Sequence, residues 1–187
     1  MTKKVHNFSA GPSILPDKVF DQASLAINNF NGTGLSVIEI SHRSKDFMDV
    51  LEEARFLALE ISGLDVNKYS CLFLQGGASM QFLMTAYNFL NKNAAYINTG
   101  SWSTKAIKEA KLFGNVTEVA SSSDRNFNYI PKNVNTNEDY DYLHLTSNNT
   151  IFGTQFHSFP KSNCPLIADM SSDIFSRKID FSEFDLI

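Results

Sequence analysis

The sequence predicts an α/β fold in which helices flank a mostly parallel sheet. Short apolar runs alternate along the chain with stretches of helical spacing, which is typical of parallel strands joined by helices. One of these runs, at residues 71–74, is followed by a glycine-rich turn and then by a helical pattern. The 187 residues, of which 43% are hydrophobic and 19% charged, are enough to bury one sizeable core.

Two amphipathic helices are expected in the first third of the chain. Apolar residues recur at helical spacing from Asp17 to Phe30 and, more strongly, from Asp46 to Ile61. Gly63 follows the second pattern, and glycine often ends a helix because it adopts a left-handed backbone conformation at little cost. We therefore expect the second helix to end at Gly63.

Five buried strands and two more helices make up the rest of the predicted fold. The strands are expected at residues 71–74, 94–98, 116–120, 142–146 and 165–169, and the helices at Ser79–Leu90 and Ser103–Phe113. The segment from Ser121 to Asp141 is polar and aperiodic, so we expect a long excursion within one domain.

Ligands of open α/β sheets bind beyond the carboxyl ends of the strands. Four segments of this sequence follow predicted strands, namely Gln75–Ser79, Asn98–Trp102, Thr146–Thr150 and Asp169–Ser172. We expect these four segments to converge on one cleft.

Charge and composition exclude several functional classes. The net charge is −4 and the basic clusters are short, which argues against a nucleic-acid surface. The N-terminus lacks the apolar core of a signal peptide, and no run approaches the roughly 18 apolar residues of a membrane span. We therefore expect a cytoplasmic protein without a membrane partner. Cys71 and Cys164 lie far apart without a metal-binding pattern, so neither a disulfide nor a metal site is expected.

The glycine-rich turn at residues 75–79 is a candidate phosphate site. A helix N-terminus presents backbone N–H groups without intrahelical partners and a partial positive charge, and both attract an anion. Gly76 and Gly77 would let the backbone approach that anion, and the Ser79 hydroxyl would add a donor. The alternative is that these small residues only allow the helix to pack on the sheet.

Two further residues would complete a cofactor site. Asp169 ends an apolar run, where a charged carboxylate is costly unless a cation pairs with it; the alternative is that it caps the following turn. Trp102 would stack on a flat ring, or else be an ordinary core or surface aromatic. A phosphate site at residues 75–79 (the phosphate seat), an aromatic residue that stacks on a ring and a buried acid together match pyridoxal phosphate. Its protonated ring nitrogen requires an acid beside it.

Six sequence blocks resemble those of the phosphoserine aminotransferases, class V members of the fold-type-I pyridoxal-phosphate enzymes. They run from Phe8 to the end of the chain in the family's order. The blocks are NFSAGPSILP (7–16), SVIEISHRSKDF (36–47), LQGGASMQF (74–82), TGSWSTKAIKEA (99–110), LTSNNTIFGTQF (145–156) and IADMSSDIFSRKID (167–180). The resemblance implies an N-terminal arm at residues 1–15 and, at 16–187, part of the large domain, incomplete at its C-terminus.

The resemblance also implies a set of site residues. Those at the cofactor are Ala78 and Ser79 on the phosphate, Trp102 on the ring, Thr150 near the ring hydroxyl, Asp169 at the ring nitrogen and Ser171 beside it. His42 and Arg43 would bind the distal phosphate or carboxylate of the substrates, because an arginine fork binds such groups through two hydrogen bonds. The alternative for this pair is an exposed position at the start of a helix. Some relatives have, in place of Ser79, an arginine that also reaches the substrate, so in this chain the distal anion must find its remaining charge elsewhere.

The activity implied for the complete enzyme is transamination between O-phosphoserine or 3-phosphohydroxypyruvate and 2-oxoglutarate or glutamate. It belongs to serine biosynthesis, and the family members are homodimers. The lysine that forms the Schiff base is expected beyond Ile187, so no residue of this chain is assigned as catalytic and residues 1–187 alone are expected to be inactive.

Three alternatives to this activity stay open. One is another class V enzyme, such as an alanine–glyoxylate aminotransferase or a cysteine desulfurase. Another is a non-catalytic α/β domain that binds a phosphorylated ligand. The third is an inactive interaction protein derived from the enzyme.

Overall fold

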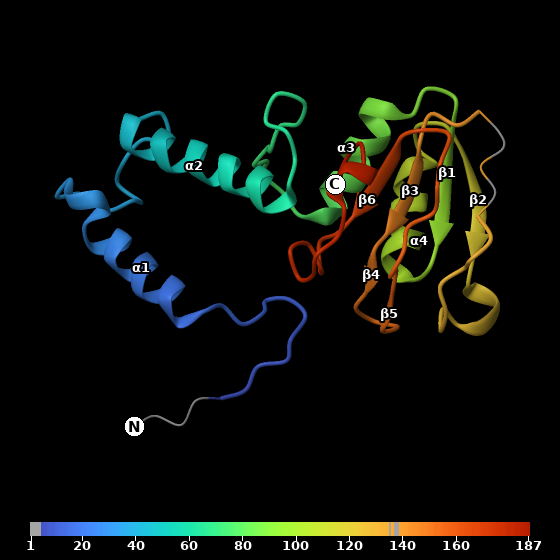
Figure 1. Cartoon of the computed structure of the whole chain (residues 1–187), viewed down its shortest axis with the longest axis horizontal. Coiled ribbons are helices and arrows are strands. Elements are labelled where there is room, and N and C mark those ends of the chain that lie inside the picture. Colours follow the sequence, from blue (N-terminus) through green and yellow to red (C-terminus); the bar gives the residue numbers. More distant parts are fainter. Residues whose placement is uncertain (1–4, 135, 137–138) are drawn as a thin grey trace. The chain divides into compact units, whose positions relative to one another are not determined.

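The computed structural model describes residues 5–134, 136 and 139–187 (Figure 1). The chain divides into two compact units, with the boundary between Leu72 and Phe73. The first unit contains α1 (Asp17–Asn28), the short 3-10 helix η1 (Phe30–Gly32) and α2 (Lys45–Ser62). The division into an arm at 1–15 and a domain from residue 16 stays a prediction.

Helix α2 ends at Gly63, as its sequence predicts, and begins one residue before the predicted pattern at Asp46. The Ser44 hydroxyl caps its N-terminus by accepting a hydrogen bond from the backbone N–H of Phe47. Gly63 ends it with a φ of +68°, in the left-handed region. Neither α1 nor α2 contains a fully buried residue. Large apolar side chains such as Phe20 and Ile61 are more than half exposed, at 56% and 64%.

The second unit is built on a parallel sheet of four strands. These are β1 (Asn93–Asn98), β2 (Asn115–Ser121), β3 (Leu143–Thr146) and β6 (Leu166–Asp169). They lie side by side in the order β2-β1-β3-β6 (Figure 1). Leu143 pairs with Leu166 and Thr146 with Asp169, so β3 and β6 end at the same level.

Helices α3 (Ala78–Phe89) and α4 (Ser101–Ala110) pack together with the strands in one apolar cluster. Its buried members are Phe82, Ala86, Leu90, Ala94, Tyr96, Ala106, Ile107, Ala110, Tyr142 and Ile167. Within the cluster the hydroxyls of Tyr96 and Tyr142 lie 2.8 Å apart. Burial raises the pKa of both tyrosines, so the two neutral hydroxyls satisfy each other.

The prediction of a strand at residues 71–74 is wrong. This segment has no regular structure, and Leu72 and Leu74 are 66% and 51% exposed. A strand needs a neighbour for its backbone N–H and C=O groups, and none of the described residues pairs with this segment. The sheet formed by the described residues therefore has four strands instead of the expected five.

Three short features outside the four-stranded sheet belong to the second unit. A short antiparallel hairpin joins β4 (Asn148–Asn149) to β5 (Thr154–Gln155). It is not predicted from the sequence, because two-residue strands are too short to show an alternating pattern. The described part of the excursion at 121–141 contains the short 3-10 helix η2 (Ser123–Arg125), and η3 (Phe181–Glu183) lies near the end of the chain. Among the described residues, no helix is long and apolar enough to cross a membrane.

The carboxylate of Asp141 holds the backbone that leads into β1. Its Oδ2 accepts hydrogen bonds from the backbone N–H groups of Asn91, Lys92 and Asn93, at 2.8, 2.6 and 3.0 Å. Burial opposes ionisation of this carboxyl, but the three backbone donors outweigh it and lower the pKa of Asp141. The charged carboxylate therefore stabilises the folded state.

Asp141→Asn is expected to lower the free energy of unfolding by about 1–2 kcal/mol at pH 7, because an amide oxygen is a weaker acceptor. The folded-state pKa of Asp141 is lowered. Its contribution to the free energy of unfolding is therefore complete above the unfolded-state pKa, and it is lost as the pH falls through the folded-state pKa. The difference between the two proteins should thus shrink toward zero as the pH falls through the folded-state pKa of Asp141. Urea unfolding followed by fluorescence of Trp102, the single tryptophan of the sequence, measures it. A difference that persists in acid would mean that the carboxylate charge is not the cause.

Candidate cofactor site

The glycine-rich turn leads directly into α3. Gly76 has a φ of +96°, and a Cβ at this position would lie 3.0 Å from the Cβ of Met80, so only glycine fits without strain. Gly77 is the N-cap residue of α3 and offers the first-turn amides no side-chain acceptor. Ala78 and Ser79 follow in the first turn, where backbone N–H groups are oriented toward an incoming anion.

A hydrogen-bonded turn between β1 and α4 orients Trp102. The hydroxyl of Ser103, which is fully buried, accepts hydrogen bonds from the backbone N–H groups of Thr99 and Gly100, both at 2.9 Å. It also donates to Oδ1 of Asn98 at 3.1 Å. Trp102 therefore stands in the first turn of α4, with its side chain partly exposed.

Trp102 meets Thr150 because the turn before α4 approaches the β4–β5 hairpin closely. A Cβ on Gly100 would lie 2.7 Å from Oδ1 of Asn149 and 3.0 Å from the ring of Phe152, so a larger residue would separate the two segments. The indole Nε1 of Trp102 donates to the Thr150 hydroxyl at 3.1 Å. Since that hydroxyl oxygen accepts the bond, its own proton can be donated to a ligand.

Asp169 ends β6 and is half-buried. Its Oδ1 accepts a hydrogen bond from the backbone N–H of Ser171, at 3.1 Å, and another from the Ser171 hydroxyl. These bonds are the turn cap that local sequence suggests. No donor among the described residues bonds to the second oxygen, Oδ2, so the cap does not exclude contact with a ligand.

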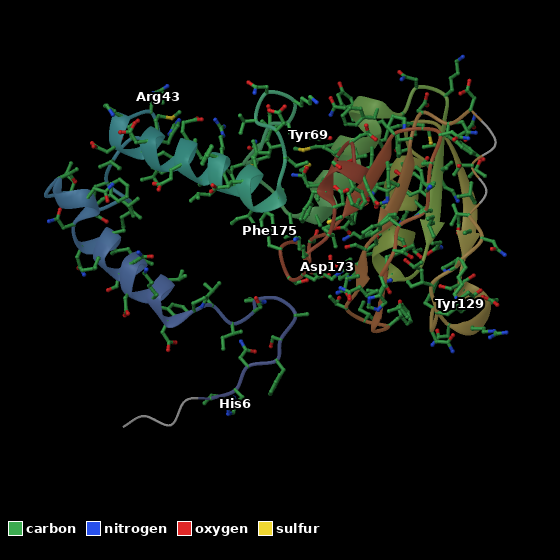
Figure 2. The ribbon with its side chains drawn as sticks, viewed as in Figure 1. His6, Arg43, Tyr69, Tyr129, Asp173 and Phe175 are labelled. Carbon is green, nitrogen blue, oxygen red and sulfur yellow. The ribbon has the colours of Figure 1, made fainter. Side chains whose placement is uncertain are left out.

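The backbone of Asp169 is held by a polar network on the neighbouring hairpin. Ser147 donates its backbone N–H and its hydroxyl to the carbonyl oxygen of Asp169, at 3.0 and 3.1 Å. The same hydroxyl contacts the buried carboxylate of Asp173, which also accepts from Gln155 at 3.0 Å and lies 3.7 Å from Arg177 (Asp173 is labelled in Figure 2). This network fixes the strand end from which the Asp169 side chain projects.

A buried histidine shapes the electrostatics of Asp169. His144 is 2% exposed, and its ring stacks on Tyr96 with 4.8 Å between centroids. Burial lowers the pKa of His144 to about 4, against the opposing attraction of the Asp169 carboxylate. His144 is therefore neutral at pH 7, and in the described ranges no basic side chain forms a salt bridge with Asp169. A cationic group of a ligand would be a favourable partner for this carboxylate.

His42 and Arg43 lie in the first unit, in the turn before α2, and both are exposed (Arg43 is labelled in Figure 2). The backbone N–H of Arg43 donates to the hydroxyl of Ser41 at 3.2 Å, which shapes this turn. Because both precede the N-cap Ser44, they stand outside the helix rather than in its first turn. Their assignment to the substrate stays a prediction.

The other six predicted residues share the second unit, where contacts link most of them. Trp102 bonds to Thr150, and Asp169 bonds to Ser171. Ser79 is linked to Trp102 through a residue that the sequence reasoning missed: the ammonium of Lys105 donates to the Ser79 hydroxyl at 2.7 Å and lies 6.0 Å from the centre of the Trp102 ring. Lys105 follows Trp102 by three positions, but nothing in the local sequence indicates its contact with Ser79 on another helix.

These groups suit one kind of ligand. The start of α3, Ser79 and Lys105 offer donors and positive charge to an anion. The indole of Trp102 offers a flat apolar face, and the carboxyl of Asp169 offers an acceptor to a protonated nitrogen. A flat heteroaromatic compound with a phosphate group and a basic ring nitrogen would use all three.

Known proteins are similar to this chain in sequence and in fold. A family model described as Aminotransferase class-V matches residues 5–186. The phosphoserine aminotransferase of Flavobacterium johnsoniae is 61% identical over 186 residues, which are 98% of this chain and 52% of that protein. A solved structure on radiation damage of the Schiff base in phosphoserine aminotransferase is 48% identical, with a TM-score of 0.93 over 97% of this chain and 52% of its own. The pyridoxal-phosphate-bound phosphoserine aminotransferase of Trichomonas vaginalis is 34% identical, with a TM-score of 0.88 over 97% of this chain and 52% of its own.

The chain thus spans about half the length of the curated relatives it matches. The resemblance to phosphoserine aminotransferases is confirmed, and so is the α/β fold with a mostly parallel sheet and flanking helices. Since the family model matches nearly every residue, the chain belongs to the aminotransferase class-V family.

Proposed function

We propose that this chain is the N-terminal part of a pyridoxal-phosphate-dependent phosphoserine aminotransferase. The full protein would transfer an amino group between O-phosphoserine and 2-oxoglutarate, or between glutamate and 3-phosphohydroxypyruvate, in serine biosynthesis. The observation that carries the proposal is the edge of the sheet where an anion seat, the Trp102 ring and the Asp169 carboxyl occur together. The 61% identity to a phosphoserine aminotransferase supports the choice of substrates.

The donor set fits this cofactor. Pyridoxal phosphate has a phosphate group, a flat ring with a hydroxyl and a ring nitrogen, and when bound it supplies an electron sink for the substrate's α-carbon. Gly77, Ala78 and Ser79 would hold its phosphate at the start of α3. Trp102 would cover one ring face, while the free proton of the Thr150 hydroxyl would serve the ring hydroxyl.

Asp169 would keep a proton on the ring nitrogen. The serine bonds at Oδ1 fix the orientation of the carboxylate, and the neutral His144 beside it offers no competing positive charge. A protonated ring nitrogen would therefore be the main cation for Asp169. This arrangement favours the form of the cofactor that withdraws electrons.

We assign His42 and Arg43 to the distal anion that the two amino-acid substrates share. Arg43 would bind phosphate or carboxylate through two hydrogen bonds, and His42 would add one donor. We further propose that the full protein is a cytoplasmic homodimer, as expected from the family resemblance.

The direct test compares the full-length protein with a polypeptide of residues 1–187. Each is mixed with pyridoxal phosphate, glutamate and 3-phosphohydroxypyruvate, and phosphoserine is measured. We expect turnover by the full-length protein and none by residues 1–187. The reason is that transamination needs an amine at the reacting carbon, whereas Lys105, which contacts Ser79, would lie at the phosphate end of the cofactor.

Other results would favour other functions. Turnover by residues 1–187 alone would overturn the view that the reacting lysine lies outside them. A full-length protein that binds pyridoxal phosphate but aminates glyoxylate, or releases sulfur from cysteine, would be a different class V enzyme. Binding without any turnover would support a non-catalytic domain.

A further inference from the structure

Lys105 lies where α4 meets the first turn of α3. Its Nζ is 2.7 Å from Oγ of Ser79 and 6.0 Å from the centre of the Trp102 ring. The side chain is exposed, and in the described part of the chain it forms no salt bridge. An ammonium group is thus held beside a helix N-terminus by a neutral hydroxyl and an indole.

The start of α3 slightly disfavours a cation at this exposed position and favours an anion. The N-terminus of a helix carries a partial positive charge, so a neighbouring cation is repelled while an anion is attracted. Gly77 caps α3 without a side chain, and Ser79 has no charge of its own. An anion placed between the first-turn amides and the ammonium would satisfy both sets of donors.

The direction of the hydrogen bond between the two side chains supports the same conclusion. An ammonium group can only donate, so Ser79 accepts in the bond with Lys105. The proton of the Ser79 hydroxyl is then available to another acceptor. The serine proton, the remaining ammonium protons and the backbone N–H groups of the first turn all suit one phosphate.

We propose that Lys105 is the cation of the phosphate seat, where it binds the phosphate of the cofactor and holds it as a dianion next to Trp102. This inference rests on the proposed function and deepens it by adding a binding residue on α4. A serine at position 79 leaves the seat without a fixed positive charge on α3, and Lys105 supplies that charge from α4.

The test uses the full-length protein freed of cofactor and three variants. Lys105→Gln removes the charge, and Lys105→Arg keeps it. Lys108→Gln is the matched control, because Lys108 is an exposed lysine on the same helix for which no contact with the site is seen. The Kd values of pyridoxal phosphate and of pyridoxal, which lacks the phosphate, are measured by absorbance titration.

Lys105→Gln is expected to raise the Kd of pyridoxal phosphate about 10- to 100-fold, as for loss of a charge-assisted hydrogen bond, and to leave that of pyridoxal unchanged. Lys105→Arg should keep most of the affinity, and Lys108→Gln should behave like the unsubstituted protein. Inorganic phosphate should compete with pyridoxal phosphate less well in the glutamine variant.

Phosphorus NMR of the bound cofactor gives a readout independent of activity. In the unsubstituted protein the ³¹P shift should stay at its dianion value down to about pH 5, because the cation lowers the phosphate pKa from its ordinary value near about 6. In Lys105→Gln the shift should titrate at a higher pH. A residue that only supports the packing of α3 on α4 would not change this titration.

The outcomes separate the two proposals. If Lys105→Gln raised the Kd values of pyridoxal and pyridoxal phosphate equally, or changed neither, the role of Lys105 would be overturned while the proposed function stayed intact. Failure of the unsubstituted protein to bind pyridoxal phosphate would overturn both. Circular dichroism of each variant shows whether the fold is kept, and Lys105→Arg still tests the proposal if the glutamine variant unfolds.

Discussion

Asp169→Asn in the full-length protein should lower the rate of transamination about a hundredfold or more without unfolding it, as for loss of a charged hydrogen bond in the transition state. Asparagine keeps the size of the side chain and an oxygen that can accept from Ser171. It removes the negative charge that would keep the ring nitrogen protonated. The neighbouring His144 is neutral and buried, and an imidazole cannot supply a negative charge in its place.

The measurement is kcat with saturating glutamate, together with the affinity for glutamate. A group that acts mainly in the transition state lowers kcat with little change in KM. The control is Asp139→Asn. Asp139 is exposed and precedes the start of β3, whereas Asp169 stands at the opposite edge of the sheet, where the strands end. Near-normal turnover in Asp169→Asn would remove the assignment of this residue to the ring nitrogen.

Arg43→Ala should weaken transition-state binding of phosphoserine and glutamate by about 2–4 kcal/mol, the range for loss of a charged, two-point hydrogen bond. Alanine as amino donor has no distal anion and should be nearly unaffected. The exposed position of Arg43 before α2 means that its removal leaves the helix cap at Ser44 intact. The effect should therefore appear in kcat/KM and not in the stability of the fold.

The control for this variant is Arg55→Ala. Arg55 lies in the same unit on α2, where it pairs with Glu52 at 2.6 Å. Arg55→Ala should not lower kcat/KM selectively for any of the three amino donors. If Arg43→Ala reduced activity with phosphoserine, glutamate and alanine equally, Arg43 would have a structural role instead of binding the distal anion.

Local sequence patterns predict the helices and most strands well, because their causes are local. Helix α2 has a serine cap at one end and a left-handed glycine at the other, and both signals stand in the sequence within a residue of the observed ends. The segment at residues 71–74 shows the limit of such patterns. Its apolar residues are typical of a buried strand, yet a strand exists only where another strand can pair with it.

Some residues of the candidate site can likewise be recognised from the sequence, and others only from the fold. Gly76, Ser79, Trp102 and Asp169 stand out in the sequence, because each has a residue type suited to its place after a predicted strand. Lys105 does not stand out, since one lysine on an amphipathic helix is usually solvated. Its contact with Ser79 joins residues 26 positions apart in the sequence, and only the packing of α3 against α4 creates it.

By itself, the sequence determined the class of fold, the order of the helices and of the four paired strands, the membership of the family and the chemical types of the site residues. These follow from periodicity, turn residues and motifs, which act over a few neighbouring positions. The tertiary structure decided the strand order β2-β1-β3-β6, the absence of a strand at 71–74, the neutral state of His144 and the contact of Lys105 with Ser79. Each of these depends on which distant segments pack together, and burial and pairing between such segments are properties of the folded chain as a whole.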